Sequence, residues 1–200
     1  MNWEPIIPSI VGGLLTGTFA ITAQFFATRW TYNNNTRLGQ RQQQKRTKAI
    51  LQAIRIDFEI AYEIYYRKAG KFVEQLPDGQ PYFQFFKEPE SWLIVYPNHT
   101  EVVGQLNDPE LSKAIMLAYY EGKYVIDGLQ VNNWYLERII EMNKLRAEGP
   151  NSYVDANYPN CRDTLVKLAP GLKKGNHVFK ASIENVSQQI DRYLSRDSEE

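Results

Sequence analysis

The sequence predicts an all-α protein: an N-terminal transmembrane helix followed by a cytosolic antiparallel bundle of three to four long helices, with a short aromatic hairpin or loop. Three observations predict it. An uncharged stretch of 24 residues lies near the N-terminus, later segments carry apolar residues at spacings of three and four, and the β-branched, aromatic runs are short. We therefore expect a transmembrane anchor over residues 1–30, a basic juxtamembrane connector over 31–48 and a helical bundle over 49–197.

The uncharged stretch covers residues 5–28. As an α-helix it would be roughly 36 Å long, enough to span a hydrocarbon core of about 30 Å. Trp3 and Trp30 flank it, and tryptophan is typical of both membrane interfaces. A buried core helix and a helix lying on the membrane surface stay open as alternatives, because Gln24 and several threonines lower its hydropathy.

Charge predicts how the anchor is oriented. Glu4 is the only acidic residue before Asp57, whereas seven basic residues lie in the same part of the chain. Basic residues beside a spanning helix stay in the cytoplasm, so the N-terminus should lie outside and the helical domain inside. The predicted interface residues on the basic side are Arg29, Trp30, Arg37, Arg41, Lys45 and Arg46.

Small residues recur four apart within the predicted anchor. Gly13 and Gly17 form a GxxxG element, and Gly12, Thr16 and Ala20 form a second row. Small residues let two membrane helices approach closely, so these rows predict a homo-oligomer.

Residues 37–48 of the connector are polar all round, which indicates a solvated segment beside anionic lipid headgroups. Nucleic acid is the rival anion. It is disfavoured because no aromatic residue interrupts the basic run and because the bilayer lies so close.

Three segments have helical periodicity. The first begins at Leu51, should bury a stripe that includes Tyr65 and Phe72, and ends near Leu76 before the turn signal Pro-Asp-Gly. The second follows Asn107-Asp108-Pro109-Glu110, a helix-start pattern, should bury a stripe from Leu111 to Ile139 that includes Asn132, and continues to about Leu145. The third carries its stripe from Leu165 to Tyr193, with a kink or break expected at Pro170. Residues 80–106 hold two aromatic, β-branched runs, which predict an apolar loop or a minimal hairpin.

The sequence has no pattern that indicates catalysis, a cofactor or a metal. Neither His99 nor His177 has a second ligand at metal-binding spacing, and phosphate-binding and dinucleotide glycine motifs are missing. The lone cysteine, Cys161, allows no intrachain disulfide, agrees with a reducing cytosol and is expected to be an inert thiol. We therefore predict a protein that is not an enzyme.

Polar residues lie on or near the apolar stripes. They include Asp57 on the first helix and Asp127, Asn132 and Asn133 on the second. Such groups either form hydrogen bonds between helices or bind a small ligand inside the bundle. The sequence favours the structural role and leaves the ligand open.

Several motifs resemble those of a group of short, mostly uncharacterised bacterial single-pass membrane proteins. They are SIVGGLLTG in the anchor, IRIDFEIAYEIYY in the first helix, the turn PDGQPYF and the segment IDGLQVNN. The resemblance implies a location in the bacterial inner membrane, with no assigned activity and no functional residues to carry over.

Together these features predict a membrane-anchored helical module that binds or scaffolds a protein partner. The alternative is an oligomerising membrane effector, toxin-like or used in phage defence, that perturbs the inner membrane.

Overall fold

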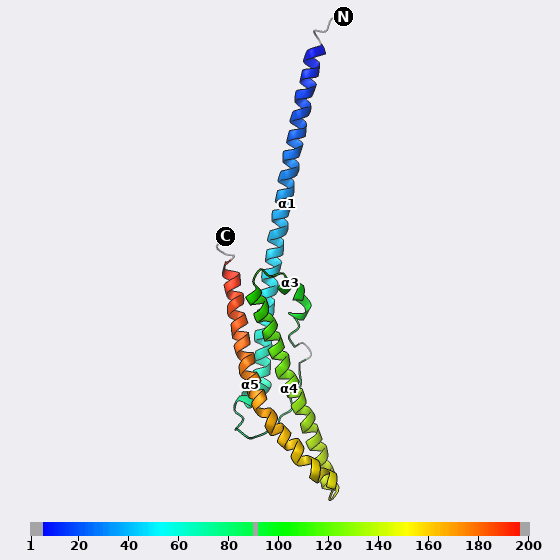
Figure 1. Ribbon diagram of the computed structural model, residues 1–200, viewed down its shortest axis with the longest axis vertical. Helices are drawn as coiled ribbons and strands as arrows, with labels where there is room; N and C mark the ends of the chain where they lie inside the picture. The colour runs from blue at the N-terminus through cyan, green and yellow to red at the C-terminus, as the bar shows by residue number, and fades with distance from the viewer. Residues whose placement is uncertain (1–5, 90–91, 197–200) are drawn as a thin grey trace. The chain divides into compact units, whose positions relative to one another are not determined.

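A computed structural model describes the backbone of residues 6–89 and 92–196, and the side chains of the same residues except 6–27 and 33. The chain divides into two units, Met1–Thr47 and Lys48–Glu200. Every regular element in the described ranges is helical, which confirms the all-α prediction. The elements are α1 (Ile6–Tyr65), the π-helical turn η1 (Tyr66–Gly70), α2 (Lys71–Glu74), the 3₁₀ turn η2 (Pro97–His99), α3 (Thr100–Gly104), α4 (Pro109–Glu148) and α5 (Ser152–Arg196) (Figure 1).

The first unit contains the beginning of α1, which is helical from Ile6 and continues without a break through Asn33–Asn35. A search of the described residues finds no membrane-spanning helix. The side chains on which the predicted anchor depends, those of residues 6–27, lie outside that description. The anchor therefore stays a prediction.

The second unit is a bundle of α1 from Lys48 onward, α4 and α5 (Figure 1). Both α1 and α4 run antiparallel to α5. Arg55 and Tyr62 of α1 contact Asp191 and Phe179 of α5, respectively, in that reversed order. Hence α1 and α4 run in the same direction, and the prediction of antiparallel neighbours holds only for the pairs that include α5. Between α2 and α4 the chain returns to the start of the bundle, and its described residues there form no long helix.

The bundle has two separate apolar cores. The larger core joins α1, the loop and the adjoining halves of α4 and α5, and its fully buried residues include Phe58, Tyr65, Ile115 and Phe179. The smaller core lies farther along the helical hairpin and consists of Leu136, Ile139, Met142, Val154, Cys161 and Leu165. Cys161 is therefore buried among apolar side chains, as expected for an inert thiol.

The register of the first helix differs from the prediction near its end. Tyr65 is fully buried as expected, but Phe72 is 37% exposed and Val73 is buried in its place. The cause is the π-helical turn, which adds one residue to the helical repeat and moves the buried positions to Ala69 and Val73. The expectation for Phe72 was thus wrong.

Residues 75–89 and 92–96 belong to an extended loop, which we call the aromatic loop, and none of these residues lies in a strand. The sequence predicted either an apolar loop or a minimal hairpin here, and the described residues form the loop. Tyr82, Phe86 and Leu93 bury their side chains in the larger core. The unpredicted short helix α3 follows and packs Val102 and Val103 into the same core.

Of the two helices in the hairpin, only α4 begins and ends close to the residues that the sequence indicated. Asp108 caps α4 by accepting a hydrogen bond from the Leu111 amide at 3.0 Å, as the helix-start pattern predicted. By contrast, α5 begins at Ser152 and passes through both Pro159 and Pro170 without a break. Figure 1 shows α5 changing direction in its orange stretch. Of the two outcomes expected from the sequence, a kink or a break, the helix is therefore bent and not broken.

Candidate functional site

The side of α4 that faces away from the core carries a row of large apolar and aromatic residues. Leu117, Tyr120, Tyr124 and Val131 follow one another at spacings of three, four and seven, so they share one helix face. Tyr120 and Tyr124 are 61% and 64% exposed. We call this the α4 outer face, and its members are Met116, Leu117, Tyr120, Tyr124, Val131 and Trp134.

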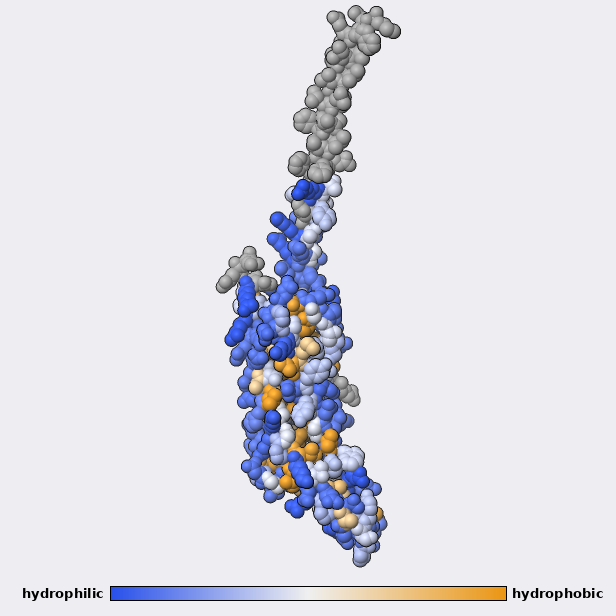
Figure 2. Space-filling model, viewed as in Figure 1, coloured by the Kyte–Doolittle hydropathy of each residue, from blue (hydrophilic) through white to orange (hydrophobic). Residues whose placement is uncertain are grey.

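Local sequence explains why this face is exposed. The opposite side of α4 supplies the strict core stripe, which includes Ile115, Ala118, Gly122, Val125 and Leu129, and all of these are buried. A helix can turn only one such stripe toward the core, so the second apolar row remains in solvent. Figure 2 shows hydrophobic side chains in patches among hydrophilic ones on the visible face of the second unit.

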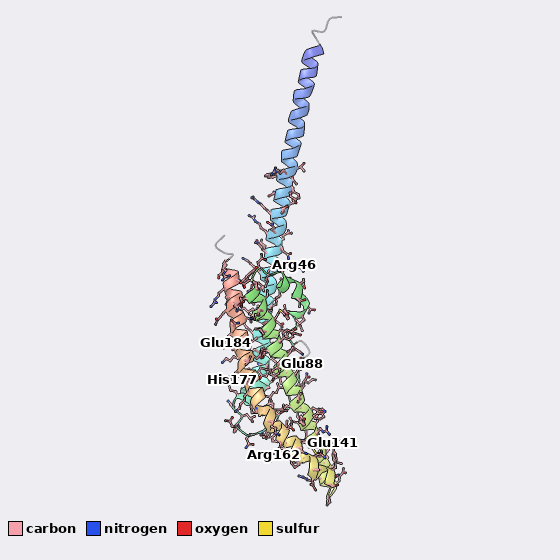
Figure 3. The ribbon with its side chains drawn as sticks, viewed as in Figure 1. Arg46, Glu88, Glu141, Arg162, His177 and Glu184 are labelled. Atoms are coloured by element: carbon pink, nitrogen blue, oxygen red, sulfur yellow. The ribbon has the colours of Figure 1, made fainter. Side chains whose placement is uncertain are left out.

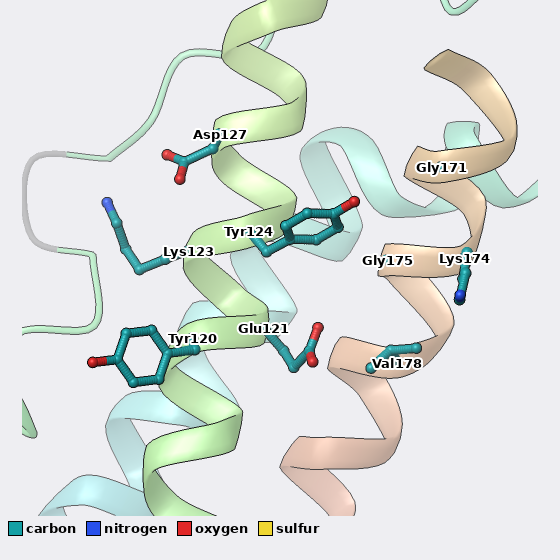
Figure 4. Close-up of a pocket in the computed structure, with 9 residues that line it drawn as sticks. All are labelled: Tyr120, Glu121, Lys123, Tyr124, Asp127, Gly171, Lys174, Gly175 and Val178. Carbon is teal, nitrogen blue, oxygen red and sulfur yellow. The ribbon is translucent and has the colours of Figure 1, made fainter. Parts of the chain in front are cut away.

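A hollow of about 570 Å³ opens between α4 and α5 beside this face, and we call it the interhelical hollow. Gly171 and Gly175 line its α5 side together with Lys174 and Val178, and the two glycines add no side chain to the space (Figure 4). The ring of Tyr124 reaches over Gly175, where a Cβ would lie 3.8 Å from two ring carbons. Tyr120 points away from α5 (Figure 4).

A second hollow, of about 510 Å³, lies beside the first turns of α4, and we call it the proximal hollow. Its lining is mainly apolar and includes Leu106, Pro109, Met116 and Leu117. Tyr120 lines both hollows, so the two meet at this residue.

Charged residues of opposite sign border the two hollows. Lys113 lines the proximal hollow, whereas two acids and two lysines line the interhelical one: Glu121, Asp127, Lys123 and Lys174. Lys123 is held by Glu88, the loop residue labelled in Figure 3, at 3.4 Å. Within the part of the chain that the structure describes, no ion pair engages Lys113 or Asp127.

The structure does not bring the polar residues singled out in the sequence into one site. Asp57 is half-buried and accepts a hydrogen bond from the Val95 amide at 2.9 Å. Its burial raises its pKa above the ordinary value of an aspartate. Asn133 binds Phe86 of the aromatic loop, and Asp127 is exposed on the outer side of α4. Thus Asp57 and Asn133 fasten the loop to two helices, which is the structural role.

Asn132 is fully buried, and neither atom of its side-chain amide has a hydrogen-bond partner in the described part of the chain. It lies between Leu129 of the larger core and Leu136 of the smaller one. Two buried tyrosines, Tyr65 and Tyr82, also have hydroxyls without a partner there. Burial raises the pKa of Tyr82 to about 12 and that of Tyr65 still further, so both stay neutral and act as packing groups.

The predicted membrane residues fall into two groups. Trp3, Gly12, Gly13, Thr16, Gly17 and Ala20 lie outside the residues whose side chains are described. Arg29, Trp30, Arg37, Arg41, Lys45 and Arg46 are exposed on α1. Their proposed contact with lipid is therefore untested.

In the described ranges, no group of three or more histidine, cysteine, aspartate or glutamate side chains is placed to hold a metal ion. Sequence reasoning missed the α4 outer face, although its signal was present. The row from Leu117 to Val131 has the same helical spacing as the core stripe, on the opposite side of the helix.

No protein-family model, curated protein or solved structure matches the chain.

Proposed function

We propose that this chain is a membrane-tethered binding module, whose α4 outer face holds a protein partner at the bacterial inner membrane without catalysing a reaction. The tether is the uncharged stretch of residues 5–28, supported by its length and by the basic residues that follow it. The helical domain would lie in the cytoplasm.

One observation carries the binding role: six large apolar or aromatic side chains are exposed on the outer side of a single helix, next to two hollows. Exposed apolar patches rimmed by polar residues are typical of surfaces that bind another protein. Tyrosine and tryptophan are also the residues that most often supply binding energy at interfaces. A small ligand fits less well, because the exposed side chains extend far beyond either hollow.

Co-purification from detergent tests this function. Leu117→Glu and Tyr124→Glu each place a charge on the α4 outer face, and they should remove a stoichiometric partner that the unmodified chain retains. Lys180→Glu is the matched control, because Lys180 is exposed on α5 and lines neither hollow.

Circular dichroism should show equal helix content for the three variants. A partner that survives both substitutions on α4, or the lack of any stoichiometric partner, would contradict the proposal.

A further inference from the structure

The exposed residues on the outer side of α4 are arranged symmetrically about Tyr120. Lys113 lies seven residues before it and Asp127 lies seven residues after it, and both are exposed. Met116 and Tyr124, which are also exposed, lie four residues before and after it. These positions share one side of the helix, because steps of four and seven residues return close to the same face. A half-turn about Tyr120 therefore brings each of these residues to the level of its counterpart.

This half-turn is the symmetry of two α4 helices that pack antiparallel as a two-fold dimer. It sets Lys113 of each copy opposite Asp127 of the other, so one interface contains two pairs of opposite charge. It also sets Met116 opposite Tyr124, and the two Tyr120 side chains meet at the axis. Within the described part of the chain, neither Lys113 nor Asp127 is engaged in an ion pair that would compete with these contacts.

The same symmetry operation places each hollow opposite the other. Pro109 lines the proximal hollow eleven residues before Tyr120, and Val131 lies eleven residues after it. Val131 is 45% exposed, and it would cover the mainly apolar proximal hollow of the second copy. Met116 would in turn face the interhelical hollow beside Tyr124. The contact from Pro109 to Val131 extends over 22 residues, or about 33 Å of helix.

The other charged residues of the interhelical hollow have nearby charges of opposite sign within their own chain. Lys123 is held by Glu88 of the aromatic loop at 3.4 Å. Glu121 points toward α5, and Lys174 lies on that helix with the opposite charge (Figure 4). The pairing therefore depends on Lys113 and Asp127, both of which belong to the second unit.

Resting on the proposed function, we propose that the partner on the α4 outer face is a second copy of this chain, packed antiparallel about a two-fold axis at Tyr120. Such a contact uses one surface twice, so both copies pair their charges and cover their hollows at once. A parallel pair would set Lys113 against Lys113 and Asp127 against Asp127, and like charges disfavour that arrangement. A helix of an unrelated protein is the alternative occupant, and it predicts no cross-link between copies.

Cysteine cross-linking tests the geometry in membranes treated with a copper–phenanthroline oxidant. Tyr120→Cys should form a disulfide-linked dimer by itself, because residue 120 meets its own copy at the axis. Met116→Cys and Tyr124→Cys should cross-link only when the two variants are co-expressed. Two copies of either residue lie about 12 Å apart along the helices, which is too far for a disulfide. The unmodified chain, whose Cys161 is buried, and Lys180→Cys should form no cross-link.

Charge exchange tests the pairing itself. Lys113→Glu or Asp127→Lys alone should weaken dimer formation roughly tenfold, because each variant creates two like-charge pairs in every dimer. The double variant should restore the dimer, and so should a mixture of the two single variants, because each then supplies the charge that the other needs. Sedimentation in detergent measures these effects, with Gly13→Leu and Gly17→Leu in every chain to remove association through the predicted anchor. Lys180→Glu should leave the dimer unchanged.

Self-cross-linking of both Met116→Cys and Tyr124→Cys, the lack of a cross-link at position 120, or a double charge variant that fails to recover would overturn the inference. If so, and if Leu117→Glu and Tyr124→Glu still remove a co-purified protein of another sequence, the proposed function stands and the second copy falls. If no substitution on the α4 outer face changes any association, both fall.

Discussion

Leu93 of the aromatic loop packs directly onto Gly122 of α4. A Cβ placed on Gly122 would lie 2.7 Å from Leu93 Cδ1 and 2.9 Å from the ring of Phe179. Leu93 is buried with a φ of 49°, a left-handed conformation that is costly for leucine. The missing side chain at Gly122 is thus what lets the loop and α5 close on α4.

We expect Gly122→Ala to lower the free energy of unfolding by about 1–3 kcal/mol, because the added methyl must displace two buried side chains. Gly171→Ala is the matched control. It lies in α5 with nothing within 4 Å of the added atom, and it should raise stability by about 0.5–1 kcal/mol through helix propensity. Urea unfolding followed by circular dichroism measures both, and equal effects at the two glycines would refute this packing.

The aromatic loop is fastened to α4 by Asn133. The Phe86 amide donates to Asn133 Oδ1 at 3.0 Å, and Asn133 Nδ2 donates to the Phe86 carbonyl at 2.7 Å. Asn133→Ala would leave both partly buried backbone groups without partners, at a cost of about 1–3 kcal/mol. Hydrogen exchange of the loop should also become faster, whereas Asn143→Ala, on the exposed side of α4, should change neither measurement.

Asp57 makes the stability depend on pH. Its folded pKa is raised by burial from the ordinary 3.8, so this group favours the folded state below that value, and the contribution is lost as pH rises through the folded pKa. In Asp57→Asn this part of the pH dependence should vanish, because an amide does not titrate, and the loop should stay attached because the amide oxygen can still accept from Val95. Unfolding titrations from below pH 3.8 upward test it. Asp163→Asn, an exposed change on α5, should retain the wild-type slope.

Self-association through the anchor is a separate prediction. Gly13→Leu combined with Gly17→Leu should abolish cross-linked oligomers in membranes, because the larger side chains keep two helices apart. Gly39→Leu is the control, since Gly39 has open space around it on α1. Loss of membrane potential on overexpression, abolished by the same pair, would favour the effector role over the binding role.

The sequence was sufficient for the parts of the fold that depend on periodicity. Every residue of the predicted α4 stripe, from Leu111 to Ile139, is buried, including Asn132. The same spacing of apolar residues also located the core side of α1 as far as Tyr65. These segments are long and strongly periodic, which is where such reasoning is most dependable.

The features of the fold that the sequence did not predict depend on tertiary contacts. The π-helical turn places Gly70 against Asn176 of α5. A Cβ added to Gly70 would lie 3.0 Å from Asn176 Oδ1, and no local sequence pattern predicts that contact. A kink or a break was expected at Pro170, but Pro159 and Pro170 both lie inside α5 on its exposed side, and Val154 and Leu165 of the same helix pack into the smaller core. The α4 outer face is a second apolar row on the same helix, and periodicity alone does not say which of two such rows is buried.

Site-specific photo-crosslinking in intact membranes shows whether the α4 outer face contacts a protein partner there. A photoreactive phenylalanine derivative replaces Tyr120, at the meeting point of the two hollows, or Lys180 as the control. The account predicts one discrete protein adduct in the membrane fraction from position 120 and none from position 180. Adducts of equal strength at both positions, no adduct at position 120, or recovery of the chain in the soluble fraction would contradict it.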